Sequence, residues 1–215
     1  MDIIKNYKTL PLGKFQQIVE LKRNEDIEDI ERHTRILSIL TDRTEAELLR
    51  LPLPEFKMLG AAASFLDKDI EALPRKLANV YHIGDFDLVP TMDVAKMTAA
   101  QFIDYNTMTA GLTEKDLDAH IVEILSCFLV PKDMEYCDGY DVAEVQAALR
   151  DNLSVYDAVT MLAFFLKSSV QYVQDSLRYS VRMAKGIKDK KKRKEMLEKI
   201  SEAADLLRNG GGSQM

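Results

Sequence analysis

Tryptophan is absent from this 215-residue sequence, which also has only two cysteines, six prolines and nine glycines. Two cysteines are too few for a disulfide scaffold, and 47% hydrophobic with 30% charged residues excludes a largely disordered or collagen-like chain. The longest apolar-rich run, residues 158–166, contains Thr160 and has about half the length that spans a bilayer. The scarcity of helix breakers, together with many Leu, Ala, Glu, Lys and Met residues, favours helices.

The two cysteines, Cys127 and Cys137, bear on the compartment. Nothing else in the sequence is typical of a secreted protein, and the first residues lack the apolar core of a signal peptide. We therefore expect a cytoplasmic protein with reduced thiols and no membrane contact. Cys127 lies in the apolar segment 124–129, where a cysteine usually serves as a small buried hydrophobe.

Charge is distributed unevenly along the chain, whose net charge is −6. Residues 178–199 contain ten Lys or Arg against three acidic residues and carry +7, which leaves −13 for the remainder. The overall acidity argues against a general nucleic-acid-binding protein. It also divides the chain into an acidic body and a basic C-terminal segment.

Spacings of three and four between apolar residues predict a mainly α-helical bundle of about eight helices. Capping patterns mark five helix starts, at Thr44, Thr98, Thr113, Asp141 and Ser154. The one strand signal, at 77–90, predicts a β-hairpin, which must lie on the helices or pair with something else because a lone hairpin is marginal. We expect an N-terminal helical lobe at 1–76, a hairpin-containing helical lobe at 77–185, a basic helix at 186–208 and a flexible tail at 209–215.

The longest predicted helix follows Ser154 and carries an apolar seam of about seven turns. Its members are Val159, Leu162, Leu166, Val170, Val173, Leu177, Val181 and Ala184. Phe164 and Phe165 widen this face near its start, and Tyr172 and Tyr179 are expected to pack. A helix of this length is either the spine of the domain or an interface with another subunit, and the sequence favours the spine.

Catalytic signatures are scarce. His33, His82 and His120 are the only histidines, and Asp116, His120 and Glu123 could share one helical face and bind a metal or transfer protons. An ordinary stabilised helix surface has the same spacing, and we favour that interpretation. Neither a nucleotide-binding glycine pattern nor a nucleophile elbow is present, so the sequence predicts a protein that is not an enzyme, without catalytic, cofactor or metal residues.

The basic run is the candidate partner-binding site. It consists of Lys188, Lys190, Lys191, Lys192, Arg193 and Lys194. One interpretation is a solvated helix entry; the other is a contact with an acidic protein or with the phosphates of packaged nucleic acid. No aromatic residue lies within 185–199, so base stacking is not expected there. We predict that 185–199 projects from the main body and contacts an acidic surface.

Four segments resemble small helical proteins of tailed bacteriophages that are encoded among virion-morphogenesis genes, some of them similar to tail-assembly chaperones. The segments are Leu10-Pro11-Leu12-Gly13-Lys14-Phe15, Leu51-Pro52-Leu53-Pro54-Glu55-Phe56, Met97-Thr98-Ala99-Ala100-Gln101-Phe102-Ile103-Asp104 and Ile124-Leu125-Ser126-Cys127-Phe128-Leu129-Val130-Pro131. The resemblance covers residues 10–170 and implies a non-enzymatic protein of tail or head–neck assembly.

Such a protein would act in the host cytoplasm by binding other virion subunits, or further copies of itself. One alternative is a structural component retained in the virion, as a neck, ring or packaged protein. Another is a small metal-dependent or acid–base enzyme that uses Asp116, His120 and Glu123. The basic C-terminal segment lies outside the resemblance.

Overall fold

The computed structural model describes residues 3–68, 70, 77–91, 93–112 and 116–210. In this part of the chain the fold is mainly helical, with nine α-helices and one small antiparallel sheet, as the sequence predicts. The chain divides into two compact units, residues 1–165 and 166–215. The predicted boundaries at residues 76, 185 and 208 stay predictions, and residues 211–215 of the predicted tail lie outside the described residues.

The N-terminal part of the first unit is built from four α-helices and a 3-10 turn. They are α1 (Leu12–Arg23), α2 (Asp29–Thr41), α3 (Glu45–Leu49), α4 (Leu53–Ala63) and η1 (Ser64–Asp67). Helix α2 packs against α1, α3 and α4 and buries Leu37 and Leu40 completely or nearly so. The predicted capping box at Thr44 is confirmed, because the Thr44 hydroxyl accepts from Glu47 N–H while Glu47 accepts from Thr44 N–H.

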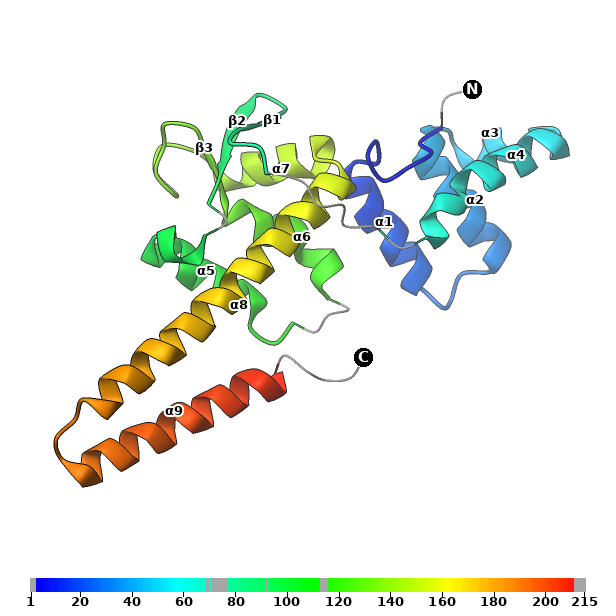
Figure 1. Ribbon diagram of the computed structural model, residues 1–215. Coiled ribbons are helices and arrows are strands. Elements are labelled where there is room, and N and C mark those ends of the chain that lie inside the picture. Colours follow the sequence, from blue (N-terminus) through cyan, green and yellow to red (C-terminus); the bar gives the residue numbers. More distant parts are fainter. Residues whose placement is uncertain (1–2, 69, 71–76, 92, 113–115, 211–215) are drawn as a thin grey trace. The chain divides into compact units, whose positions relative to one another are not determined.

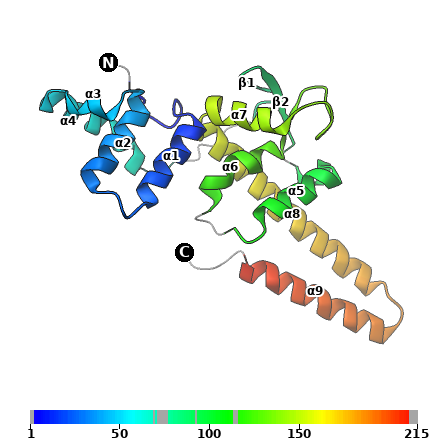
Figure 2. The same cartoon turned by 180° about the vertical axis from the view of Figure 1, so that it is seen from behind.

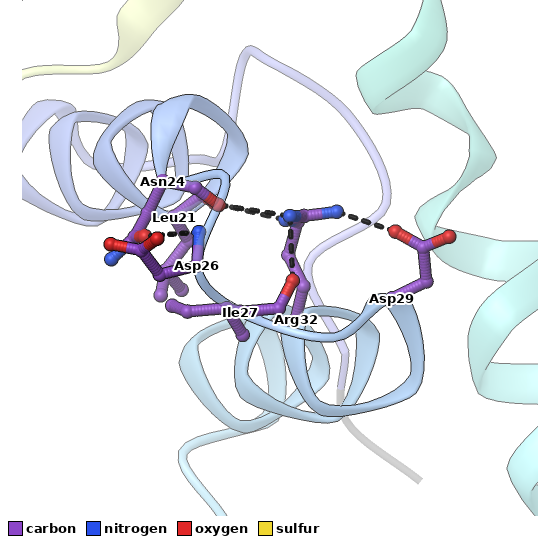
Figure 3. Close-up of polar contacts among 6 residues, drawn as sticks. All are labelled: Leu21, Asn24, Asp26, Ile27, Asp29 and Arg32. Atoms are coloured by element: carbon purple, nitrogen blue, oxygen red, sulfur yellow. Dashed lines mark hydrogen bonds and ion pairs between the residues drawn. The ribbon is translucent and has the colours of Figure 1, made fainter.

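Arg32 fixes the turn between α1 and α2 (Figure 3). Its guanidinium donates to the carbonyl oxygens of Leu21, Asn24 and Ile27, at 3.1, 2.9 and 2.7 Å, and pairs with Asp29 at 2.6 Å. Carbonyls that the end of α1 leaves without helical partners thereby gain donors from a single side chain. Asp29, the first residue of α2, belongs to the acidic run and supplies the carboxylate among the four acceptors of Arg32.

The rest of the first unit combines the sheet with helices from α5 onward (Figure 2). Its elements are β1 (Tyr81–Ile83), β2 (Phe86–Pro90), η2 (Val94–Lys96), α5 (Ala99–Thr109), α6 (Leu117–Ser126), β3 (Leu129–Pro131), α7 (Val142–Asn152) and the start of α8 (Val155–Lys185). The predicted hairpin is confirmed, with Ile83 opposite Phe86 and Gly84 in the left-handed conformation at φ 55°.

The hairpin is stabilised by a third strand that the sequence did not predict. Strand β3 pairs antiparallel with β2, with Val89 opposite Val130, and gives the order β1-β2-β3. All three residues of β3 are buried, so the segment has no alternation of apolar and polar residues to reveal a strand. The predicted helix through Phe128 was two residues too long, because α6 ends at Ser126.

The predicted helix starts vary in how they are capped. Thr98 forms the full reciprocal box with Gln101. Asp141 accepts from Ala143 N–H instead of the predicted Glu144, and Ser154 accepts from Asp157 N–H. Thr113 lies outside the described residues. The start of α8 is also tied to the N-terminal segment, because Leu12 N–H donates to the Leu153 carbonyl and Val155 N–H donates to the Leu10 carbonyl.

The second unit contains the remainder of α8 and helix α9 (Lys190–Gly210). The chain turns at residues 186–189, as predicted near Gly186, and α9 runs back antiparallel to the end of α8 (Figure 1). None of the helices in the described ranges is long and apolar enough to cross a membrane.

The predicted seam of α8 is interrupted. Four of its members, Val159, Leu162, Leu177 and Val181, are half-buried and Ala184 is fully buried, but Leu166 and Val170 are exposed. The side chain of Val173 lies outside the described part of the structure. In its first turns the buried residues are Val155, Ala158, Met161 and Phe165, whereas Leu166 is 40% and Val170 56% exposed. The expectation that Phe164 and Phe165 both widen a buried face holds only for Phe165, because Phe164 is 37% exposed. A unit of two helices has too few neighbours to cover a helix on every side, which explains the exposure of Leu166 and Val170.

Candidate binding surface

The predicted basic run occupies the α8–α9 turn and the first turns of α9. We call Lys188, Lys190, Lys191, Lys192, Arg193 and Lys194 the cationic surface; all are exposed except Arg193, which is half-buried. Asp189 caps the helix inside this run, since its carboxylate accepts from the N–H groups of Lys191 at 2.8 Å and Lys192 at 3.1 Å. Two of the backbone donors at this end of the helix are thus already used, and a partner would meet mainly the charged side chains.

The position of these charges opposes local helix stability. The N-terminal end of a helix carries the positive end of its dipole and favours acidic side chains. Helix α9 has no acidic residue in its first turn, and like charges stand three and four residues apart between Lys190 and Lys194. Of the six cations, Lys194 pairs with Glu198 at 3.7 Å, and within the described ranges the other five have no ion pair. Sites that break a local rule in this way are often functional.

An exposed apolar stripe lies on the α8 part of the same unit. Tyr172, Tyr179 and Met183 are 43%, 63% and 56% exposed, so the expectation that the two tyrosines pack was wrong. Steps of seven and four residues place the three side chains on one side of the helix. Tyr, Met and Arg are enriched in protein–protein interfaces, and Arg178 and Arg182 belong to the same turns. The spacing could have revealed this second stripe, but only the structure shows that it is uncovered.

The alternative site around α6 is not assembled as a metal centre. Asp116 is the N-cap residue of α6, His120 is exposed, and a Glu123 carboxylate oxygen lies 4.0 Å from the Arg150 guanidinium. In the ranges that the structure describes, no group of three or more His, Cys, Asp or Glu side chains could hold a metal ion.

The other two histidines have structural contacts. His33 packs edge-on against Phe56 with ring centroids 6.0 Å apart, and His82 pairs with Asp87 across the hairpin.

The cysteines differ in environment. Cys127 is fully buried, as predicted, and burial raises the pKa of its thiol to about 11. Cys137 is exposed, and both thiols are free.

No protein family, characterised protein or solved structure was found to match this chain.

Proposed function

We propose that this chain is a non-enzymatic assembly protein of a tailed bacteriophage, which binds an acidic virion or assembly subunit through the cationic surface. The resemblance of residues 10–170 to phage morphogenesis proteins supports the phage context. The observation that carries the binding role is the cationic surface itself. Six cations cluster at the unfavourable end of a helix, and one of them has an ion pair in the described part of the chain.

A protein partner fits this unit better than a solvated helix end does. Solvation explains exposed lysines, but it does not explain why they gather where the helix dipole and their mutual repulsion both oppose them. An acidic partner would remove both penalties at once. The neighbouring Tyr172, Tyr179 and Met183 stripe offers the apolar contact area that charge alone does not supply.

The test is affinity capture from phage-infected cells, followed by a direct binding measurement with each purified virion protein that is captured. One bait is the wild-type protein, and the second replaces Lys190, Lys191, Lys192, Arg193 and Lys194 by Gln. A matched control removes five scattered exposed charges through Gln at Lys5, Arg50, Lys57, Lys68 and Lys167.

We expect the wild type and the control to bind a virion or morphogenesis protein, with an affinity that falls steeply between about 50 and about 200 mM salt. The five-fold variant should lose that binding and its salt dependence. Equal binding by the wild type and the variant would overturn the role of the cationic surface, and the absence of any such partner would overturn the phage assignment. Mass spectrometry of purified particles separates an assembly chaperone, which leaves, from a neck, ring or packaged protein, which stays.

A further inference from the structure

The acidity of the chain is concentrated in one stretch. Residues 1–76 carry 13 basic and 14 acidic residues and are nearly neutral at −1. Residues 77–165 carry 4 basic and 15 acidic residues, or −11, and residues 166–215 carry 12 basic and 6 acidic residues, or +6. The change of sign coincides with the division into two units at residue 165. Each copy of the protein therefore presents one strongly acidic and one strongly basic part.

The fold brings part of this acidity to one end of the sheet. The hairpin turn, the beginning of β2 and the end of β3 share that end, because Lys132 N–H donates to the Asp87 carbonyl at 2.7 Å. The loop after β3 leads from there to α7, which packs against β1. We call the exposed carboxylates of this region the acidic surface; they are Asp85, Asp87, Asp133, Glu135, Asp138, Asp141 and Glu144.

A second copy of the chain offers the cationic surface the complementary charge that it lacks. Two cationic surfaces would repel each other, so a symmetric contact between them is unfavourable. A nucleic acid would meet the repulsion of a first unit that carries −12, and no aromatic residue in 185–199 is available to stack on its bases. The acidic surface of another copy has neither disadvantage.

We infer that the cationic surface of one copy docks on the acidic surface of the next, so that the protein self-associates head to tail. This inference rests on the proposed binding role of the cationic surface and adds a second copy as a partner. A head-to-tail contact uses two different surfaces and does not close on itself in a dimer. It extends into a ring or an open chain, so species larger than a dimer are expected.

Sedimentation velocity of the purified full chain, from micromolar to millimolar concentration, provides the test. We expect oligomers whose association constant falls more than about tenfold between about 50 and about 200 mM salt. A cationic-surface variant carries Lys190→Glu, Lys191→Glu and Lys192→Glu, changes that also suit the helix dipole and so preserve α9. An acidic-surface variant carries Glu135→Lys, Asp138→Lys and Glu144→Lys at exposed positions.

Each variant alone should be monomeric, because its substitutions reduce the charge of one surface from +6 to 0, or from −7 to −1, and so remove the attraction between copies. An equimolar mixture of the two should associate again through the two surfaces that remain unchanged. Circular dichroism of each variant verifies that the helices are retained. A wild type that stays monomeric at low salt, or a variant that associates as the wild type does, would overturn the inference. Binding of a duplex oligonucleotide by a protein that stays monomeric would also overturn the inference. The same holds for a monomer whose frictional ratio changes with salt, because that change would indicate pairing of the two surfaces within one copy. Loss of virion-subunit binding alone would overturn the proposed function and leave self-association standing.

Discussion

Phe128 and Phe165 stack with their ring centroids 3.7 Å apart and their planes inclined by 23°. Tyr105 meets Phe165 edge-on at 4.9 Å, so three aromatic side chains join α5, the approach to β3 and the first part of α8. Phe128 and Phe165 are both fully buried. This contact fixes the last residue that α8 contributes to the first unit, and the neighbouring Phe164 is partly exposed.

Phe165→Ala should therefore destabilise the first unit much more than Phe164→Ala. Removal of a buried phenylalanine costs about 3–5 kcal/mol in lost apolar burial and in the cavity that remains. The adjacent Phe164 is a matched control, because its ring is 37% exposed and its loss leaves a smaller cavity. Urea denaturation followed by tyrosine fluorescence measures both free energies of unfolding. Equal losses at the two positions would contradict the buried arrangement.

Arg32→Lys should loosen the turn between α1 and α2. The guanidinium bonds to three carbonyl oxygens and one carboxylate, and an ammonium group cannot reach all of them from one position. Because a hydrogen bond to a charged group contributes about 1.5–3 kcal/mol, we expect a loss of at least about 2 kcal/mol. Amide hydrogen exchange of residues 24–28 should become faster.

The control for this substitution is Arg178→Lys. The Arg178 side chain is 72% exposed and pairs with Asp175 within one helix, so its replacement should change the free energy of unfolding by less than about 1 kcal/mol. Unchanged exchange in the turn of the Arg32→Lys variant would show that the four contacts do not act together.

Local features of this fold were predictable from the sequence, and long-range ones were not. The capping boxes at Thr44 and Thr98 and the hairpin turn depend on residues two to five apart, which a sequence displays directly. Strand β3 exists because it pairs with β2 some forty residues earlier along the chain. A three-residue strand that is buried throughout leaves no local pattern to detect.

The candidate binding surface also has features that the sequence predicts and features that depend on the fold. The cationic surface is a property of composition, and its location on the α8–α9 turn follows from Gly186 and the capping residue Asp189. Exposure of Tyr172 and Tyr179 depends on which helices cover α8, and no spacing within α8 contains that information. The same limitation applies to Leu166 and Val170, the exposed members of the predicted seam.

Gln101→Glu should be strongly destabilising at neutral pH. The Gln101 side chain, 3% exposed, accepts from Thr98 N–H through Oε1 and donates through Nε2 to the Cys127 carbonyl at 3.0 Å. A carboxylate keeps the first bond, but it turns the second into a contact between two acceptors and leaves a buried charge unpaired. We expect a loss of about 3–5 kcal/mol at neutral pH.

The loss should shrink at about pH 4, near the ordinary pKa of Glu, because protonation restores a donor and removes the charge. Burial raises the pKa of a carboxyl, so the recovery should begin above that value. Glu47→Gln is the reverse change in the exposed box at Thr44, and there we expect a much smaller loss of stability. A Gln101→Glu variant that is as stable as the wild type at neutral pH would refute the bond to Cys127.

The two thiols should differ in reactivity. Burial raises the pKa of Cys127 to about 11 from an ordinary value of 9.0, whereas Cys137 is exposed. At a pH below both values, a difference of two units lowers the reactive thiolate fraction about a hundredfold. A thiol reagent should therefore modify one cysteine per chain quickly in the folded protein, and the second only on unfolding. Cys137→Ser should abolish the fast reaction, and Cys127→Ala should leave it unchanged.

The raised pKa of Cys127 also makes the free energy of unfolding decrease at alkaline pH. In the folded protein Cys127 holds its proton more tightly than in the unfolded chain, so its contribution to stability is intact below about pH 9. As the pH rises from about 9 toward about 11, the unfolded chain ionises first and the free energy of unfolding falls. Cys127→Ala should lose less stability over this interval than the wild type, as measured by urea denaturation at each pH. Two fast thiols in the folded protein, or identical pH slopes for the wild type and Cys127→Ala, would contradict a buried, protonated Cys127.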